Sequence, residues 1–226
     1  MAEFGPLQAL WGGFATFWSI WQACIMQITP FFVAFMASLF LITTERRGKY
    51  EGFLLPPVFF TFGFAISFSL MHSPLFMSVN PVPAWLLKIA SGIYILAIGV
   101  LLFSRAVHLV KDWLYWAGGF LLGITFGIIY MPCISPSLSK IFTIAMQPDS
   151  MTTGLLLAFL YAVGLGISLI IAGLVVIGIL HTTGAYRRYN ASLRKFFSVF
   201  LIILGLLNIT GYMVYYKSLI LKPFIK

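Results

Sequence analysis

Long apolar runs separated by short polar segments make up almost the whole chain. None of the runs alternates apolar with polar residues as a half-buried strand does, and a membrane-crossing helix needs about 20 apolar residues. The pattern predicts six membrane-spanning helices, over residues 12–42, 53–71, 85–104, 113–146, 152–180 and 196–216. We therefore expect an all-α integral membrane protein with one membrane domain, 1–226.

Prolines inside the first and fourth runs predict that these two helices are broken. Proline removes a backbone hydrogen bond and clashes with the preceding helical turn. In the fourth run the break is expected between Pro132 and Pro136, with Ser135 capping and Pro136 beginning a second half-helix, since these residue types are favoured there. Thr29 and Pro30 offer the same kind of start in the first run.

Composition and charge agree with a membrane protein. The chain is 61% hydrophobic and only 8% charged, whereas soluble domains are about a quarter charged. A net charge of +9 suggests nucleic acid, but the basic residues lie in short patches between apolar runs, which membrane topology explains more simply. Nine of the 14 Lys and Arg lie in the first, third and fifth loops, so these loops are expected inside and both termini outside the cell (inner) membrane. The nine are Arg46, Arg47, Lys49, Arg105, Lys111, Arg187, Arg188, Arg194 and Lys195.

The two halves of the chain also resemble each other. Trp11-Gly-Gly-Phe leads to Cys24, and Trp116-Ala-Gly-Gly-Phe leads to Cys133. Each half has three predicted spans, an odd number, so the second half enters the membrane from the opposite side. This predicts an inverted repeat, with halves over about 12–104 and 113–216 and a site near the bilayer midplane where they meet.

Cys24 and Cys133 are the two cysteines of the chain. Equivalent positions in pseudo-symmetric halves can approach within the 4.4–6.8 Å between Cα atoms that a disulfide requires. A half-helix that begins at Ser135 and Pro136 would stabilise a thiolate at Cys133, so we expect Cys133 to be more reactive than Cys24. The alternative is that both cysteines are small buried hydrophobic residues without a chemical role.

The segment from Phe126-Gly127 to Pro132-Cys133-Ile134-Ser135-Pro136 resembles the fourth-helix signature of the CcdA cytochrome c biogenesis family, six-helix relatives of the transmembrane domain of the disulfide reductase DsbD. The resemblance implies a thiol-disulfide oxidoreductase. In that family's mechanism, cytoplasmic thioredoxin would reduce a Cys24–Cys133 disulfide, and the dithiol would reduce an extracytoplasmic thioredoxin-like protein, in cytochrome c maturation or a related pathway. Thiol-disulfide exchange needs no cofactor, neither metal nor flavin.

Two other classes of protein stay open. A soft-metal or small-solute transporter would use the two cysteines as ligands, and a structural membrane subunit would not need them. His72, His108 and His181 lie at span ends without ligand spacing, so no metal site is predicted. Lys140 follows Cys133 by seven residues, roughly on the same helix face, and is interpreted as an outer-interface residue rather than an activator of the thiol.

Overall fold

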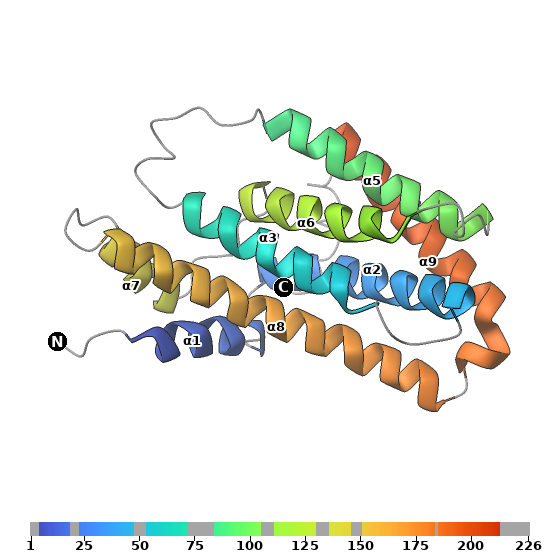
Figure 1. Ribbon diagram of the computed structural model, residues 1–226, viewed down its shortest axis with the longest axis horizontal. Helices are drawn as coiled ribbons and strands as arrows, with labels where there is room; N and C mark the ends of the chain where they lie inside the picture. The colour runs from blue at the N-terminus through green and yellow to red at the C-terminus, as the bar shows by residue number, and fades with distance from the viewer. Residues whose placement is uncertain are drawn as a thin grey trace, which may run out of the picture.

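The chain folds into an elongated bundle of helices that run along or against one long axis (Figure 1). The computed structural model describes residues 5–18, 23–47, 53–71, 84–104, 111–129, 136–145, 151–183 and 185–212. These residues form eight helices: α1 (Pro6–Trp18), α2 (Ala23–Arg47), α3 (Leu55–Met71), α5 (Ala84–Ser104), α6 (Asp112–Ile129), α7 (Pro136–Ala145), α8 (Met151–Thr182) and α9 (Ala185–Thr210).

Length and composition make this a helical membrane protein. Within the described residues, three helices are long and apolar enough to cross a bilayer, over Trp85–Ser104, Met151–Thr182 and Ala191–Thr210. Shorter apolar helices cover Thr29–Thr43, Leu55–Leu70 and Trp113–Ile128. Large apolar side chains are also exposed around the bundle, among them Val58, Phe62, Ile93, Val100, Leu156, Val175, Ile179 and Phe196. An exposed apolar surface of this extent suits lipid rather than water.

Helix α8 is the longest helix, and α1, α2, α3, α7 and α9 all contact it. Its 32 residues give a length of about 48 Å at 1.5 Å per residue, more than the hydrocarbon core of a bilayer. α1 runs parallel to the first half of α8, and the hydroxyl of Ser168, near the middle of α8, donates to the carbonyl of Phe14 at 3.2 Å. α1 therefore ends beside the middle of the bundle.

The predicted spans 53–71, 85–104 and 152–180 correspond closely to α3, α5 and α8. The last span differs, because α9 already begins at Ala185 and the segment expected to be the fifth loop is largely helical. The helix ends at Thr210, where Gly211 adopts a φ of 76°. This left-handed conformation is typical of a glycine that terminates a helix.

The first predicted span divides at a different place from the one expected. α1 ends at Trp18 and α2 begins at Ala23, so the break precedes Cys24. Pro30 lies inside α2, and the expectation that Thr29 and Pro30 begin a half-helix is wrong. A proline within a membrane helix is tolerated when neighbouring helices and local adjustments compensate for the missing hydrogen bond.

The fourth predicted span divides as expected. α6 ends at Ile129, and α7 is a separate helix whose first residue is Pro136. α6 contacts α3 and α5, whereas α7 contacts α8 and α1, so the two halves of the span belong to different parts of the bundle. Pro132, Cys133 and Ser135 lie outside the described residues, and their predicted roles stay predictions.

Two interfaces of the bundle, α1 with α8 and α6 with α3, are built alike. A Cβ at Gly13 would clash with the carbonyl of Tyr161, and a Cβ at Gly123 would clash with the carbonyl of Phe60. In the reverse direction, Gly164 lies against Leu10 and Phe14 of α1, and Gly63 lies against Phe120 and Ile124 of α6. Each interface is thus a reciprocal pair of glycines that lets two helix backbones approach closely.

These contacts define which residues of the two halves correspond. Gly13 occupies the position of Gly123, which differs from the match suggested by the Trp-Gly-Gly-Phe segments. In this correspondence Cys24 follows its glycine by eleven residues and Cys133 follows its glycine by ten. The two cysteines are therefore within one residue of equivalent positions.

Candidate functional site at the helix breaks

The candidate site lies where the two broken spans are interrupted. Cys24 is the second residue of α2. Cys133 lies outside the described residues, between Ile129 at the end of α6 and Pro136 at the start of α7. In Figure 1, α1 ends, α2 begins and α6 ends near the middle of the long axis. The breaks on either side of the cysteines therefore occur in the same part of the bundle.

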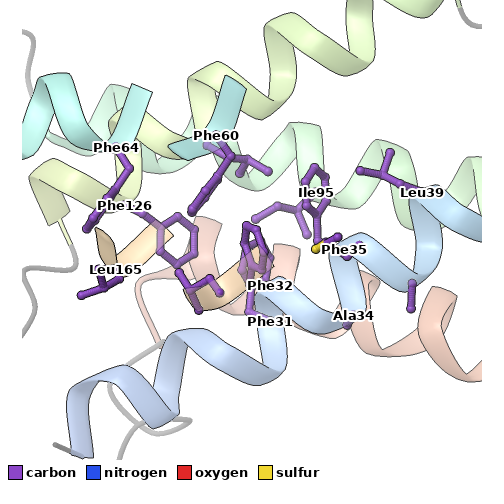
Figure 2. Packing of buried hydrophobic residues seen from close by; sticks show 14 of the residues in the cluster. Phe31, Phe32, Ala34, Phe35, Leu39, Phe60, Phe64, Ile95, Phe126 and Leu165 are labelled. Carbon is purple, nitrogen blue, oxygen red and sulfur yellow. The ribbon is translucent and has the colours of Figure 1, made fainter. Parts of the chain in front are cut away.

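A cluster of phenylalanine rings joins the start of α2 to the end of α6 (Figure 2). The rings of Phe31 and Phe126 stack with their centroids 4.8 Å apart. Phe60 of α3 lies beside both helices, with its ring centroid 4.9 Å from Phe32 and 5.8 Å from Phe126. Phe31, Phe32, Phe60 and Phe126 are each at most 2% exposed. Rings buried in this way fix the positions of the helices that carry them.

The directions of the helices determine where the cysteines lie relative to this cluster. α2 runs antiparallel to α3, because Phe32 contacts Phe60 while Phe40 contacts the earlier residue Phe53. α3 runs parallel to α6, because Gly119 lies against Pro56 and Gly127 against Phe64. α2 and α6 are therefore antiparallel.

Because α2 and α6 are antiparallel, Cys24 and the end of α6 lie on the same side of the phenylalanine cluster. Cys24 precedes Phe31 by seven residues, about 10 Å along α2. Cys133 follows Phe126 by seven residues, of which the first three belong to α6. The position of Cys133 and its pairing with Cys24 lie outside the described residues and stay predictions.

The start of α2 bears on the position of Cys24. Cys24 lies in the first turn of α2, where backbone N–H groups are free of helical partners and the helix dipole favours negative charge. Cys133 precedes the first residue of α7 by three residues. Cys133 itself lies outside the described residues, so the expectation that it is the more reactive thiol stays a prediction.

Two buried residues near the break were not expected from the sequence. The hydroxyl groups of Tyr161 and Thr16 form a hydrogen bond of 3.0 Å between α8 and α1. Tyr161 is 0% exposed and Thr16 is 6% exposed. Thr16 lies two residues before the end of α1, so this hydrogen bond holds the end of α1 against α8. Only the burial of a tyrosine in an apolar run could have drawn attention to it.

Lys140 lies on α7 and is exposed. The interpretation that it shares a helix face with Cys133 stays a prediction, because Cys133 lies outside the described residues. On α7 itself, Leu138 and Ile141 are buried and face α8 and the core.

The helix ends next to the basic connections lie at one end of the bundle. Figure 1 shows the ends of α2, α5 and α8 and the starts of α6 and α9 at the same end. Arg194 is part of α9 and not of a loop, and it is 7% exposed, whereas Lys111 and Lys195 are exposed. The helix ends that flank the first, third and fifth connections therefore lie at one end of the bundle, and the side of the membrane that this end faces stays a prediction.

The described residues include no group of three or more His, Cys, Asp or Glu that could hold a metal ion. His181 is exposed in the last turn of α8. His72 and His108 lie outside the described residues.

Comparison with known proteins returned no match: no family model, no curated protein and no solved structure matches the chain. The functional argument therefore depends on the chain's own residues and on the resemblance of its fourth-span motif.

Proposed function

We propose that this chain carries reducing equivalents across the membrane by thiol-disulfide exchange, with Cys24 and Cys133 as its redox pair. One observation carries the proposal: the rings of Phe31, seven residues after Cys24, and Phe126, seven residues before Cys133, stack with their centroids 4.8 Å apart. The resemblance of the Pro132-Cys133-Ile134-Ser135-Pro136 segment to the CcdA family supports the same chemistry.

The reaction proceeds in two exchanges. A thiolate of reduced cytoplasmic thioredoxin attacks one sulfur of the Cys24–Cys133 disulfide, forming a mixed disulfide and releasing the other cysteine as a thiolate. The second thiol of thioredoxin then attacks the mixed disulfide, so thioredoxin leaves oxidised and the chain becomes a dithiol. The dithiol reduces the disulfide of an extracytoplasmic thioredoxin-like protein in the same way. Two electrons and two protons are transferred in total, and each step needs only a thiolate and a disulfide.

The arrangement of the helices supports an inverted repeat. α1 and α3 belong to the first half of the chain, and α6 and α8 belong to the second. Interchanging the halves therefore converts the α1–α8 interface into the α6–α3 interface, as a two-fold axis requires. The α5–α9 interface is reciprocal in itself, because Gly92 lies against the carbonyl of Gly205 and Gly205 lies against that of Gly92. Inverted repeats with discontinuous helices place their sites at the meeting point of the halves. In this proposal the basic end is cytoplasmic, and both termini are outside.

The proposal is tested by the redox state of the two cysteines in membranes. Alkylation gel shifts are compared in cells with active and inactive cytoplasmic thioredoxin, using Cys24→Ser and Cys133→Ser as single-thiol standards. We expect free thiols when thioredoxin is active and an internal disulfide when it is not. Two free thiols under both conditions would overturn electron transfer and favour the metal-ligand or structural alternatives.

A further inference from the structure

The outward face of α9 changes from apolar to polar at one point along the helix. Phe196 is 64% exposed, and Val199 and Ile203 are 47% and 50% exposed. Ser192 and Lys195, which precede them in the helix, are exposed as well. Because successive residues are separated by 100°, these five side chains lie within an arc of about 100°. One stripe along α9 therefore passes from large apolar side chains to polar ones between Phe196 and Lys195.

This change of polarity marks where hydrocarbon gives way to lipid headgroups. Apolar side chains exposed along a spanning helix suit the hydrocarbon of a bilayer, whereas an ammonium group there is costly. The neighbouring helices carry the same kind of boundary at this end of the bundle, where α5 and α8 finish and α6 starts (Figure 1). In these terminal turns they expose Phe103, Ile179 and Trp113. Lys195 therefore lies at the level of the headgroups.

The part of α9 beyond this boundary is helical and basic. Residues 185–195 form about 16 Å of helix at 1.5 Å per residue. They contain no Asp or Glu, and their basic residues are Arg187, Arg188, Arg194 and Lys195. Arg194 is buried, whereas Lys195 is exposed. Among the side chains that the structure describes in this part of α9, Lys195 is the basic one on the lipid-facing stripe.

The neighbouring helix ends add further positive charge. α2 ends with Arg46 and Arg47, and the exposed Lys111 directly precedes α6. The acidic residues of these two ends are Glu45 and Asp112, so basic residues outnumber acidic ones in the helix ends that the structure describes. A basic cluster next to a spanning helix attracts anionic lipids, and each Lys or Arg near the surface strengthens the attraction about fivefold.

We propose that the start of α9 binds an anionic phospholipid, with Lys195 at its headgroup and its acyl chains along Phe196 and Ile203. Lys195 precedes Ile203 by eight residues, about 12 Å of helix, which lies within the roughly 15 Å of hydrocarbon in one leaflet. Charge selects the occupant, because any phospholipid covers the apolar stripe but only an anionic one gains net attraction from the basic helix start. The inference does not depend on the redox chemistry of the two cysteines.

The lipid preference of this stripe is measured by fluorescence quenching in the full chain with Cys24→Ser and Cys133→Ser. A bimane label is attached at Ile203→Cys, and the chain is reconstituted in phosphatidylcholine vesicles that contain either brominated phosphatidylglycerol or brominated phosphatidylcholine. We expect the brominated phosphatidylglycerol to quench the label at a content at least about fivefold lower. Equal quenching by the two lipids would overturn the proposal.

The control label is Ile93→Cys on α5. Ile93 is 56% exposed and lies at a similar depth, since Gly92 lies against Gly205 of α9. The two brominated lipids should quench this label equally. A preference for phosphatidylglycerol at both labels would mean that anionic lipid gathers around the whole bundle, and would overturn a site on α9.

The contribution of Lys195 is measured with the label at Ile203→Cys. Lys195→Gln should lower the preference for phosphatidylglycerol about fivefold, and Lys195→Arg, which keeps the charge, should preserve it. Lys140→Gln is the matched control, because Lys140 is exposed on α7, which packs against the start of α8 and not its end. An unchanged preference in Lys195→Gln, or an equal loss in Lys140→Gln, would overturn the role of Lys195.

A competition experiment separates a lipid from a soluble anion. Glycerol 3-phosphate carries a phosphate group without acyl chains, so at matched ionic strength it should leave the preference for phosphatidylglycerol unchanged. Loss of the preference on adding glycerol 3-phosphate would mean that the start of α9 binds a soluble phosphate, and would overturn a lipid site.

Discussion

The α1–α8 and α6–α3 interfaces share the same backbone geometry but differ in the side chains at the corresponding positions. Tyr161 corresponds to Phe60, and Thr16, three residues after Gly13, corresponds to Phe126. At α1–α8 the pair forms a hydrogen bond of 3.0 Å. At α6–α3 the pair is a contact of two rings with centroids 5.8 Å apart.

This difference shows that the backbone and the side chains have separate roles at the two interfaces. The glycines determine how closely the helices approach, and they do so equally at both interfaces. The side chains set how each interface responds to a displacement. A buried hydrogen bond must be kept or its groups lose a partner, whereas aromatic pairs have several favourable geometries. We therefore expect the end of α1 to be held more strictly than the end of α6.

The largest effect is expected from removing the shared glycine geometry. Gly13→Val and Gly123→Val each place side-chain atoms against a backbone carbonyl that cannot rotate away. Each substitution should lower the free energy of unfolding by about 3 kcal/mol or more. The measurement is denaturant unfolding in mixed micelles.

Gly178→Val is the matched control, because nothing lies within 4 Å of a Cβ at Gly178. It should leave stability almost unchanged apart from a small helix-propensity effect. A mild effect of Gly13→Val beside a large effect of Gly123→Val would show that the two interfaces are not equivalent, and the comparison would be lost.

The next largest effect is expected from introducing into the α6–α3 interface the hydroxyl that Tyr161 supplies at the α1–α8 interface. Phe60→Tyr places a hydroxyl in the ring cluster, where its contacts are Phe32, Phe64 and Phe126. A buried hydroxyl without a partner costs about 1–3 kcal/mol. The same unfolding measurement, with Phe59→Tyr on the exposed side of α3 as control, tests it. Full stability of Phe60→Tyr would mean that the cluster already offers an acceptor or water.

How well a structural feature can be predicted from the sequence depends on whether its physical cause lies in neighbouring residues or in distant ones. Pro136, expected to begin a helix because Ser-Pro at a helix start acts through its own and adjacent residues, is the first described residue of α7. Pro30 was wrongly predicted to begin a helix, because a proline within a membrane helix either breaks it or is accommodated, and the neighbouring helices decide between these outcomes.

The correspondence between the halves shows the same limit at longer range. The Trp-Gly-Gly-Phe segments are similar in sequence, yet the contact partners match Gly13 with Gly123. Only contacts with α3 and α8 reveal that match, and a single sequence does not contain them. The hydrogen bond of Tyr161 with Thr16 joins residues 145 positions apart and was equally beyond local patterns.

A smaller effect is expected from removing the polar group of the α1–α8 interface. Tyr161→Phe keeps the ring but leaves the hydroxyl of Thr16 without the partner it has at 3.0 Å. Hydrogen bonds between membrane helices contribute about 0.6 kcal/mol on average and at most about 1.7 kcal/mol. The double variant Tyr161→Phe with Thr16→Val should cost no more than Tyr161→Phe alone, since both partners are then apolar. Additive losses in this pair would contradict a direct interaction.

The smallest effect on stability is expected from replacing one of two serines in corresponding positions, Ser168 and Ser67. Ser168 donates to the carbonyl of Phe14 in α1 at 3.2 Å, whereas Ser67 donates within α3, to the carbonyls of Gly63 at 2.8 Å and Phe64 at 3.1 Å. Ser168→Ala should therefore cost about 0.6 kcal/mol, and Ser67→Ala close to none, because its helix keeps its backbone hydrogen bonds. Parallel unfolding titrations of the two variants resolve the difference. A larger loss for Ser67→Ala would show that the α6–α3 interface, and not the α1–α8 interface, depends on its polar groups.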